Sequence, residues 1–231
     1  MRKGTAGFLA FLILAFVAVS AWFVLKPDKK GVFLHLEPHG YTVVIDAGHG
    51  GVDGGTQALN GILESGINLE IAKKTDLLLR FYGVNTVMVR TEDISIHNPE
   101  SNTIAEKKRT DLQNRVKLAN NTPDAFLMSI HQNSFSESQY FGAQVFYAED
   151  SVSKLFAEVL QQQFYKLDAE NTRKIKQAYD SIYLMNNVTC PAVLVECGFL
   201  SNPKDSANLT TADYQTKVAM TLTSAFTMYN R

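Results

Sequence analysis

Apolar and polar residues follow two rhythms along the chain, and each rhythm predicts a different element. Continuous apolar runs rich in β-branched residues predict strands that are buried on both faces. Four such runs occupy residues 41–46, 84–90, 125–131 and 191–196. Residues 142–149 combine polar and apolar residues at their outer positions, which predicts a strand at the edge of the sheet. Apolar residues three or four positions apart predict amphipathic helices at residues 63–83, 112–121, 151–167 and 211–230.

The order of these elements predicts the fold class. Buried strands that alternate with amphipathic helices indicate an α/β domain, with a mostly parallel, twisted sheet and helices on both faces. Residues 91–110 are polar and lack periodicity, so we expect a long loop there.

The N-terminal segment has a different pattern. Residues 7–25 are 19 consecutive uncharged, mostly apolar residues with basic residues on both sides. A helix of that length nearly crosses the roughly 30 Å hydrocarbon core of a bilayer. We therefore predict a transmembrane anchor or a signal peptide at residues 1–25, with an uncleaved anchor favoured. A linker at residues 26–40 and one exported domain at residues 41–231 would follow.

Charge and cysteine content narrow the class of protein. Without residues 1–30, the chain keeps 17 of its 22 basic and 22 of its 23 acidic residues, a formal charge of −5. That balance argues against a nucleic-acid partner. The two cysteines, Cys190 and Cys197, flank a predicted strand, which would hold them roughly 23 Å apart and prevent a disulfide between them.

The sequence VVIDAGHGGVDGG at residues 43–55 places five glycines around His49. Glycine-rich turns after strands often bind phosphate, but this one lacks the third glycine of the dinucleotide fingerprint and the lysine of the P-loop. Asp53 also has the wrong charge for a phosphate neighbour. The loop therefore requires another explanation, and His49 is its most reactive side chain.

Three further polar residues are expected to converge on His49. His131 and Glu196 follow or end predicted strands, and Glu64 begins the helix after the glycine loop. In open α/β sheets, ligands bind beyond the carboxyl ends of the strands, so all four residues would meet at one edge. His49, Glu64 and His131 form a ligand set typical of catalytic zinc, which leaves Glu196 as a general base.

Each of these residues also has a simpler interpretation. A single histidine after a strand is often a hydrogen-bonded polar group, and Glu64 would interact favourably with a helix dipole. The remaining candidates are weaker: His35 and His39 fall in the predicted linker, His97 lies in the polar loop, and Cys197 would point away from Glu196 on a strand.

Four segments resemble, in order and spacing, the zinc-dependent N-acetylmuramoyl-L-alanine amidases of the type 3 family. They are VVIDAGHGGVDGG, ESGINLEIA, SIHQNS and PAVLVECGFLSNP, and the resemblance covers roughly residues 41–230. Carried over by position, the family's ligands for one Zn²⁺ fall on His49, Glu64 and His131, and its catalytic glutamate falls on Glu196. Ser65 and Gln132 replace residues usual in the family and border this site.

The resemblance is strongest to members that act on spore-cortex peptidoglycan. It implies a hydrolase that removes stem peptides from muramic acid, towards muramic-δ-lactam, during sporulation and germination. It also implies an enzyme exported to the outer face of the membrane, in the forespore intermembrane space. Targeting would come from the N-terminal anchor, from expression or from an activating partner protein.

Three other functions remain open at this point. A non-catalytic cell-wall-binding scaffold on the amidase fold is the main alternative, although a binding module needs no general base. A peptidoglycan endopeptidase would use the same zinc chemistry on a different bond. A thiol hydrolase that uses Cys197 is the third.

Overall fold

A computed structural model describes residues 40–229 of the chain. The predicted anchor or signal peptide at residues 1–25 lies outside the described residues, as does nearly all of the predicted linker. Between residues 40 and 229, no helix is both long enough and apolar enough to span a bilayer.

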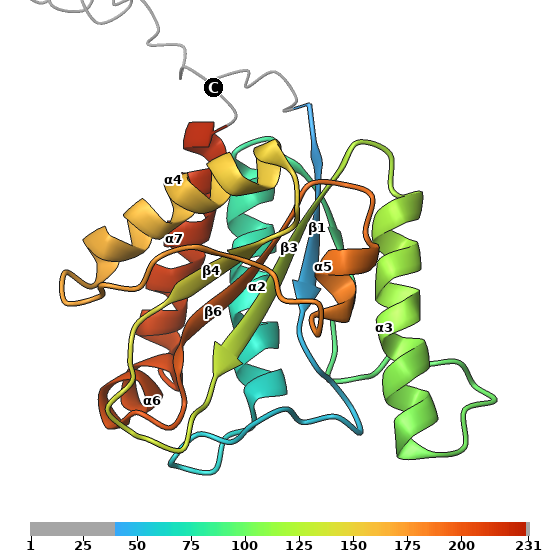
Figure 1. Cartoon of the computed structure of the whole chain (residues 1–231), viewed down its shortest axis with the longest axis horizontal. Coiled ribbons are helices and arrows are strands. Elements are labelled where there is room, and N and C mark those ends of the chain that lie inside the picture. The colour runs from blue at the N-terminus through green and yellow to red at the C-terminus, as the bar shows by residue number, and fades with distance from the viewer. Residues whose placement is uncertain (1–39, 230–231) are drawn as a thin grey trace, which may run out of the picture. The chain divides into compact units, whose positions relative to one another are not determined.

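A six-stranded sheet runs through the middle of the domain (Figure 1). Its strands lie in the order β2-β1-β3-β6-β4-β5. The bounds are β1 Thr42–Ala47, β2 Asn85–Met88, β3 Ala125–Asn133, β4 Gln144–Tyr147, β5 Lys176–Gln177 and β6 Ala192–Phe199. Within the described residues, four of the five pairings are parallel and the β4–β6 pairing is antiparallel. The prediction of a mostly parallel sheet is therefore confirmed, and the sheet is of the mixed type.

Helices cover both faces of the sheet, as predicted (Figure 1). Their bounds are α2 Glu64–Phe81, α3 Ile104–Asn121, α4 Ser151–Leu167, α5 Tyr183–Asn187, α6 Pro203–Leu209 and α7 Ala212–Tyr229. Helices α2, α4 and α7 pack on one face, where the rings of Phe126, Phe156 and Phe226 form a core of edge-to-face contacts. Helices α3 and α5 lie on the other face, which buries a smaller cluster around Val44, Leu127 and Leu194.

The structure corrects two of the predicted elements. The loop expected over residues 91–110 ends early, because α3 begins at Ile104 with a capping box formed by Thr103 and Glu106. The strand β4 is not an edge strand, because the two-residue strand β5 pairs along its outer side. The short helices α5 and α6 and the strand β5 were not predicted, since none of them is long enough to show a periodic pattern.

Three neighbouring parallel strands at the centre of the sheet position the candidate site. Strands β1, β3 and β6 lie side by side and run in the same direction. Their carboxyl ends therefore meet at one edge, the lower one in Figure 1. Side chains alternate between the two faces along each strand. His131 and Glu196 occupy paired positions, so their side chains lie on the same face of the sheet. It is the face covered by α3 and α5, because Leu127 and Leu194, an even number of residues earlier on the same strands, are buried there.

The Thr103 cap gives a testable consequence for stability. Replacing Thr103 by Ala removes the hydroxyl that accepts from the backbone N–H of Glu106 at 3.1 Å. We expect the free energy of unfolding to fall by about 1 kcal/mol, measured by urea denaturation. Thr216→Ala, in the exposed interior of α7, is the matched control and should be neutral or slightly stabilising. Equal effects of both substitutions would contradict the assigned cap.

Candidate metal centre and active site

His49 sits in the glycine-rich loop after β1 in a left-handed conformation, with φ of 61°. This conformation costs a non-glycine residue on the order of 1 kcal/mol, so the surrounding structure must hold it in place. The guanidinium of Arg115 donates to the carbonyl oxygens of Ala47 and His49 at 2.9 and 2.7 Å. The guanidinium of Arg90 donates to those of Ala47 and Gly48 at 2.9 and 3.0 Å. Two buried arginines thus fix the backbone that presents His49.

Arg115 is itself held by two carboxylates. It pairs with Asp46 at the end of β1 and donates to Asp111 at 2.6 Å within α3. Burial alone would raise the pKa of Asp46, but the charge of Arg115 outweighs it and lowers that pKa. Asp46 also accepts from the hydroxyl of Ser129 on β3 at 2.6 Å. The charges of this network are mutually compensated, as buried ions require.

Glu64 opens α2, as predicted, and only 2% of it is exposed. Its Oε2 atom accepts from the backbone N–H of Thr56 at 3.0 Å, and its Oε1 atom accepts from that of Gln132 at 3.0 Å. Gly55 has φ of +67° and lies against this carboxylate, because a Cβ there would approach Oε2 to 2.5 Å. The glycine is therefore required both by its conformation and by the space that Glu64 occupies.

The structure brings His49, Glu64 and His131 together. Nε2 of His49 lies 3.3 Å from Oε1 of Glu64, and Nδ1 of His131 lies 3.1 Å from the same oxygen. One candidate ligand atom from each residue lies within 4.8 Å of the others. Two imidazoles and a carboxylate at these distances match the His₂Glu set of catalytic zinc. The predicted convergence of these residues is confirmed.

Further contacts orient these candidate ligands. Asp53 lies 3.0 Å from Nδ1 of His49, which leaves Nε2 facing Glu64, and Lys108 pairs with Asp53 at 2.9 Å. A carboxylate on the second nitrogen is the usual means of fixing a ligating histidine. His131 packs its Nε2 side against Gly48, where a Cβ would come within 2.2 Å of that atom. Nδ1 of His131 is therefore the nitrogen that faces the other candidate ligands.

Gln132 takes part in the hydrogen bonds of the site through its side chain, and Ser65 through its backbone. The side chain of Gln132 is buried and donates to Oδ1 of Asn68 at 3.0 Å. Asn68 in turn donates to Oε1 of Glu64 at 3.2 Å. The backbone carbonyl of Ser65 accepts from Arg90 at 2.8 Å. Gln132 thus helps to position the candidate ligand Glu64 through Asn68.

The charges of the site shift several pKa values. Burial alone lowers the pKa of His49, but hydrogen bonds and charges from Glu64 and Asp53 outweigh it and raise that pKa to about 9. Burial alone raises the pKa of Glu64, but His131 and His49 outweigh it and hold that pKa below its usual range. The carboxylate of Glu64 therefore stays ionised at neutral pH, and its negative charge attracts cations.

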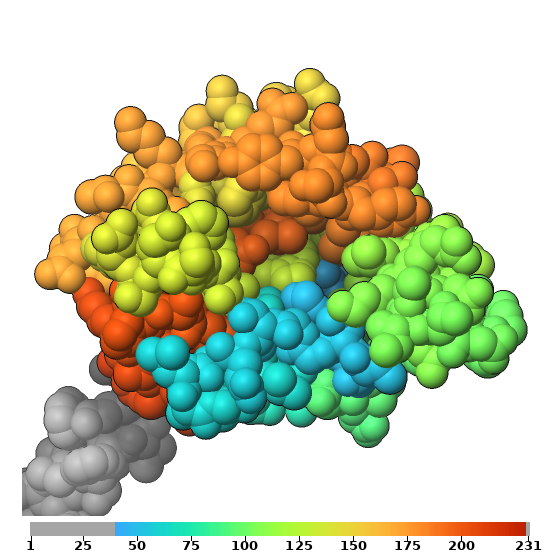
Figure 2. Space-filling view, turned by 60° about the horizontal axis from the view of Figure 1, so that its bottom comes forward, coloured from blue at the N-terminus to red at the C-terminus, as the bar shows by residue number. Residues whose placement is uncertain are grey.

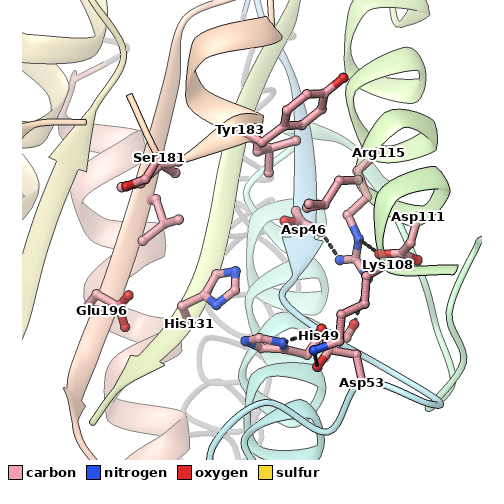
Figure 3. A pocket seen from close by; sticks show the side chains of 14 residues that line it. Asp46, His49, Asp53, Lys108, Asp111, Arg115, His131, Ser181, Tyr183 and Glu196 are labelled. Carbon is pink, nitrogen blue, oxygen red and sulfur yellow. Dashed lines mark hydrogen bonds and ion pairs between the residues drawn. The ribbon is translucent and has the colours of Figure 1, made fainter. Parts of the chain in front are cut away.

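Glu196 lies beside this cluster, on the strand next to His131 (Figure 3). It does not belong to the group of candidate metal ligands. Its Oε2 atom is buried and has no hydrogen-bond partner among the described residues. Burial, together with the charge of Glu64, outweighs the two histidines and raises the pKa of Glu196 to about 7. A carboxyl group with this pKa can both accept and donate a proton near neutrality.

His49, His131 and Glu196 line a cavity of about 330 Å³. Figure 2 shows it as a hollow in the surface whose floor is β6, between the glycine-rich loop, α3 and residues 173–185. Figure 3 shows Lys108, Asp111 and Arg115 on one wall and Ser181 and Tyr183 on another. The lining residues are Asp46, His49, Asp53, Lys108, Asp111, Leu112, Arg115, His131, Ser181, Ile182, Tyr183, Leu184, Leu194 and Glu196.

The other candidates from the sequence lie away from the cavity lining. His97 contacts the hydroxyl of Ser95 at 2.9 Å. Cys197 is buried in the core on the opposite face from Glu196, and burial raises the pKa of its thiol far above the usual range. This argues against a thiol nucleophile at Cys197. Cys190 and Cys197 are both free, as expected. His35 and His39 lie outside the described residues.

Sequence analysis missed the residues that hold the site together. Asp46 had a detectable signal, because it ends an apolar run in the same way as Glu196. Asp111 and Arg115 are four residues apart on the buried side of α3, a pattern that predicts an internal ion pair. Arg90 and Asp53 had no local signal, since their partners come from the tertiary fold.

Comparison with known proteins identifies relatives of the chain. Residues 43–227 match the family described as N-acetylmuramoyl-L-alanine amidase. The germination-specific N-acetylmuramoyl-L-alanine amidase of Bacillus subtilis (strain 168) is 35% identical over 192 residues, which are 82% of this chain and 80% of that protein.

Solved structures agree with this match. The CwlD amidase from Clostridioides difficile, in complex with the GerS lipoprotein, has a TM-score of 0.78 and 36% identity, covering 82% of this chain and 98% of that one. The catalytic domain of the amidase CwlV from Bacillus (Paenibacillus) polymyxa has a TM-score of 0.70 and 31% identity, covering 82% and 97%. The resemblance predicted from four sequence motifs is confirmed.

The pKa of His49 predicts that metal binding depends on pH. A histidine ligates a metal only when the coordinating nitrogen is free of its proton, and a pKa of about 9 means that His49 carries that proton at neutral pH. Binding of Zn²⁺ at pH 7.5 should therefore release about one proton or more, and affinity should weaken as pH falls below 9. Calorimetry in buffers of different ionisation enthalpy measures this release. Zinc binding without proton release would contradict the assignment of His49.

A second prediction concerns the Arg115 network. Arg115→Met leaves Asp46 and Asp111 without their buried counter-charge. We expect the free energy of unfolding to fall by about 3–5 kcal/mol, measured by urea denaturation. Arg80→Met is the matched control, because the side chain of Arg80 is 56% exposed in its pair with Asp76, and it should cost about 1 kcal/mol or less. A comparable loss of unfolding free energy in both variants would contradict the claim that burial makes the Arg115 network more stabilising than an exposed ion pair.

Proposed function

The chain belongs to the N-acetylmuramoyl-L-alanine amidase family, and on that premise we propose that it is a zinc-dependent peptidoglycan amidase. The bond cleaved is the amide between N-acetylmuramic acid and the L-alanine of the stem peptide. The observation that carries the proposal is the cluster of His49, Glu64 and His131 beside a partly buried Glu196.

The donor set fits one Zn²⁺. His49 would bind through Nε2, His131 through Nδ1 and Glu64 through its carboxylate. Zinc in such a site polarises a carbonyl group and lowers the pKa of a bound water towards 7. Asp53 keeps the Nε2 atom of His49 turned towards Glu64, and Asn68 and Gln132 hold the carboxylate of Glu64.

Glu196 would move the protons of the reaction. As a carboxylate it accepts a proton from the attacking water, whose oxygen then adds to the carbonyl carbon. When the C–N bond breaks, the electron pair goes to nitrogen, and Glu196 returns the proton to the departing amine of L-alanine. A single group can do both because its pKa of about 7 lies near neutrality.

The substrate we propose is spore-cortex peptidoglycan, with cleavage as a step towards muramic-δ-lactam. Support comes from the name of the germination-specific relative and from the similarity to CwlD. We further propose that residues 1–25 carry the domain across the membrane and retain it at the outer face, in the forespore intermembrane space. The apolar run at residues 7–25 supports this location.

A partner protein is also part of the proposal. The CwlD amidase from Clostridioides difficile was solved in complex with the GerS lipoprotein. We propose that a membrane-associated partner protein binds this chain and activates or targets it.

Glu196→Gln tests the assigned proton transfer. Zinc content should stay at one ion per chain, because Glu196 is not a ligand, while release of L-alanine-terminated peptides from purified peptidoglycan should fall about 10²–10⁴-fold. Glu149→Gln, at an exposed position, is the matched control and should keep full activity.

Two outcomes would overturn this assignment. Full activity of the Glu196→Gln variant would remove Glu196 from the mechanism, and loss of zinc would make it a ligand instead. Peptides with an amino terminus other than L-alanine, released by the unaltered enzyme, would indicate an endopeptidase. An unaltered enzyme that holds zinc but releases no peptide would favour the wall-binding scaffold.

A further inference from the structure

A second cavity, of about 270 Å³, opens beside the active site. Residues 176–183 separate it from the first cavity: Lys176 and Tyr179 line the second, and Ser181 and Tyr183 line the first. The second cavity also contains Arg173 and Gln144. Nothing in the proposed mechanism uses it.

The register of the sheet places this cavity next to the reacting groups. Gln144 on β4 is paired directly with Glu196 on β6, and Asn133 lies two residues beyond His131 on β3. Paired residues of antiparallel strands have Cα atoms roughly 4.5–5.5 Å apart, and two residues along a strand span roughly 7 Å. Gln144 and Asn133 both line the second cavity. A substrate at the first cavity therefore needs to extend only a short distance to enter the second.

Arg173 is held rigidly in this second cavity. Its Nε donates to the carbonyl oxygen of Phe141 at 2.8 Å, and its Nη1 donates to Oε1 of Gln144 at 3.2 Å. Its guanidinium lies 4.2 Å from the centre of the Phe199 ring. These contacts fix the plane of the guanidinium before any ligand arrives, which reduces the entropy lost on binding.

The lining of the cavity carries two positive charges and no negative charge. Arg173 and Lys176 both line it, and its lining contains no carboxylate. Over residues 40–229, neither cation forms an ion pair, whereas Lys108 and Lys204 each pair with acidic residues. Burial lowers the pKa of Arg173, although the negative charge of Asp205 acts in the opposite direction. A partly desolvated cation of this kind is a favourable partner for an anion.

Exposed aromatic rings surround the two cations. Phe135, Tyr140 and Tyr179 are 53%, 41% and 54% exposed, and the first two pack edge to face with ring centres 5.2 Å apart. Exposed aromatic side chains together with arginine are typical of binding surfaces. They offer a surface on which the aliphatic part of a ligand can pack.

We propose that this second cavity is a subsite for a carboxylate of the stem peptide, bound by Arg173 with support from Lys176. The inference rests on the proposed amidase function. A linear peptide carries at least its C-terminal carboxylate, whereas the sugars next to the scissile amide are uncharged, so the cations select the peptide side. Two to three extended residues span roughly 7–10 Å, which is enough to cross from Glu196 to Gln144 or from His131 to Asn133.

The test compares two soluble substrates of the zinc-loaded full chain. One is an N-acetylmuramoyl tripeptide with free carboxylates, and the other is the same compound with every carboxyl group amidated. The unaltered enzyme should prefer the free acid at least about 10-fold in kcat/KM. Arg173→Gln should raise KM for the free acid by about 10-fold, leave kcat within about 2-fold, and leave the amide unchanged. Lys176→Gln should act in the same direction with a smaller effect.

Lys174→Gln is the matched control, because Lys174 is exposed and does not line the cavity, and it should behave like the unaltered enzyme. Zinc content and circular dichroism establish that each variant is folded. Unchanged KM in both cavity variants would overturn the subsite, and so would equal losses on both substrates, which would indicate a sugar-binding or purely structural role.

A binding measurement separates this proposal from the proposed function. The free tripeptide, titrated calorimetrically, should bind the unaltered chain more tightly than the Arg173→Gln variant by about 10-fold. If the unaltered chain cleaves neither substrate, the amidase proposal fails while this difference in binding still supports the subsite. Equal binding to both chains overturns the subsite even if the enzyme is active.

Discussion

The candidate site depends on the pairing of Arg115 with Asp46 beneath the glycine-rich loop. Arg115 is fully buried, and the same guanidinium that neutralises Asp46 also binds the carbonyl oxygens of Ala47 and His49. A buried charge is tolerated only when it is compensated, so α3, β1 and the loop must come together as one unit. The left-handed backbone of His49 is a consequence of that packing. The position of His49 is thus set by an ion pair that lies outside the group of candidate metal ligands.

The surroundings of Glu64 and Glu196 shift the pKa values of these two carboxyl groups in opposite directions. Glu64 faces two imidazoles and two backbone N–H groups, and its pKa is low. Glu196, one strand further along, has a buried Oε2 atom with no hydrogen-bond partner among residues 40–229, and its pKa rises to about 7. Such a separation of pKa values assigns one carboxylate to charge stabilisation and the other to proton transfer. The fold therefore gives the two glutamates different surroundings, which supports the proposed roles of Glu64 as a metal ligand and Glu196 as a general base.

Most of the fold and the four polar residues of the site could be predicted from the sequence, for identifiable reasons. Long apolar runs and the spacing of α2 and α7 predicted their elements, because burial imposes a period on the residues. The edge position of β4 and the start of α3 were predicted wrongly, since a two-residue neighbour and a polar capping box leave little apolar pattern. His49, Glu64, His131 and Glu196 were found because parallel strands end at one edge. Arg90, Asp53 and the cavity around Arg173 were not found, because they depend on contacts between distant segments.

The central claim is that His49, Glu64 and His131 bind one zinc ion and that Glu196 does not. Anomalous diffraction at the zinc absorption edge, from crystals grown with Zn²⁺, measures this directly. We predict a single strong peak about 2.0–2.2 Å from Nε2 of His49, Nδ1 of His131 and an oxygen of Glu64, with both oxygens of Glu196 outside bonding distance. A peak elsewhere in the domain, or one bonded to Glu196 in place of any of the three, would contradict it.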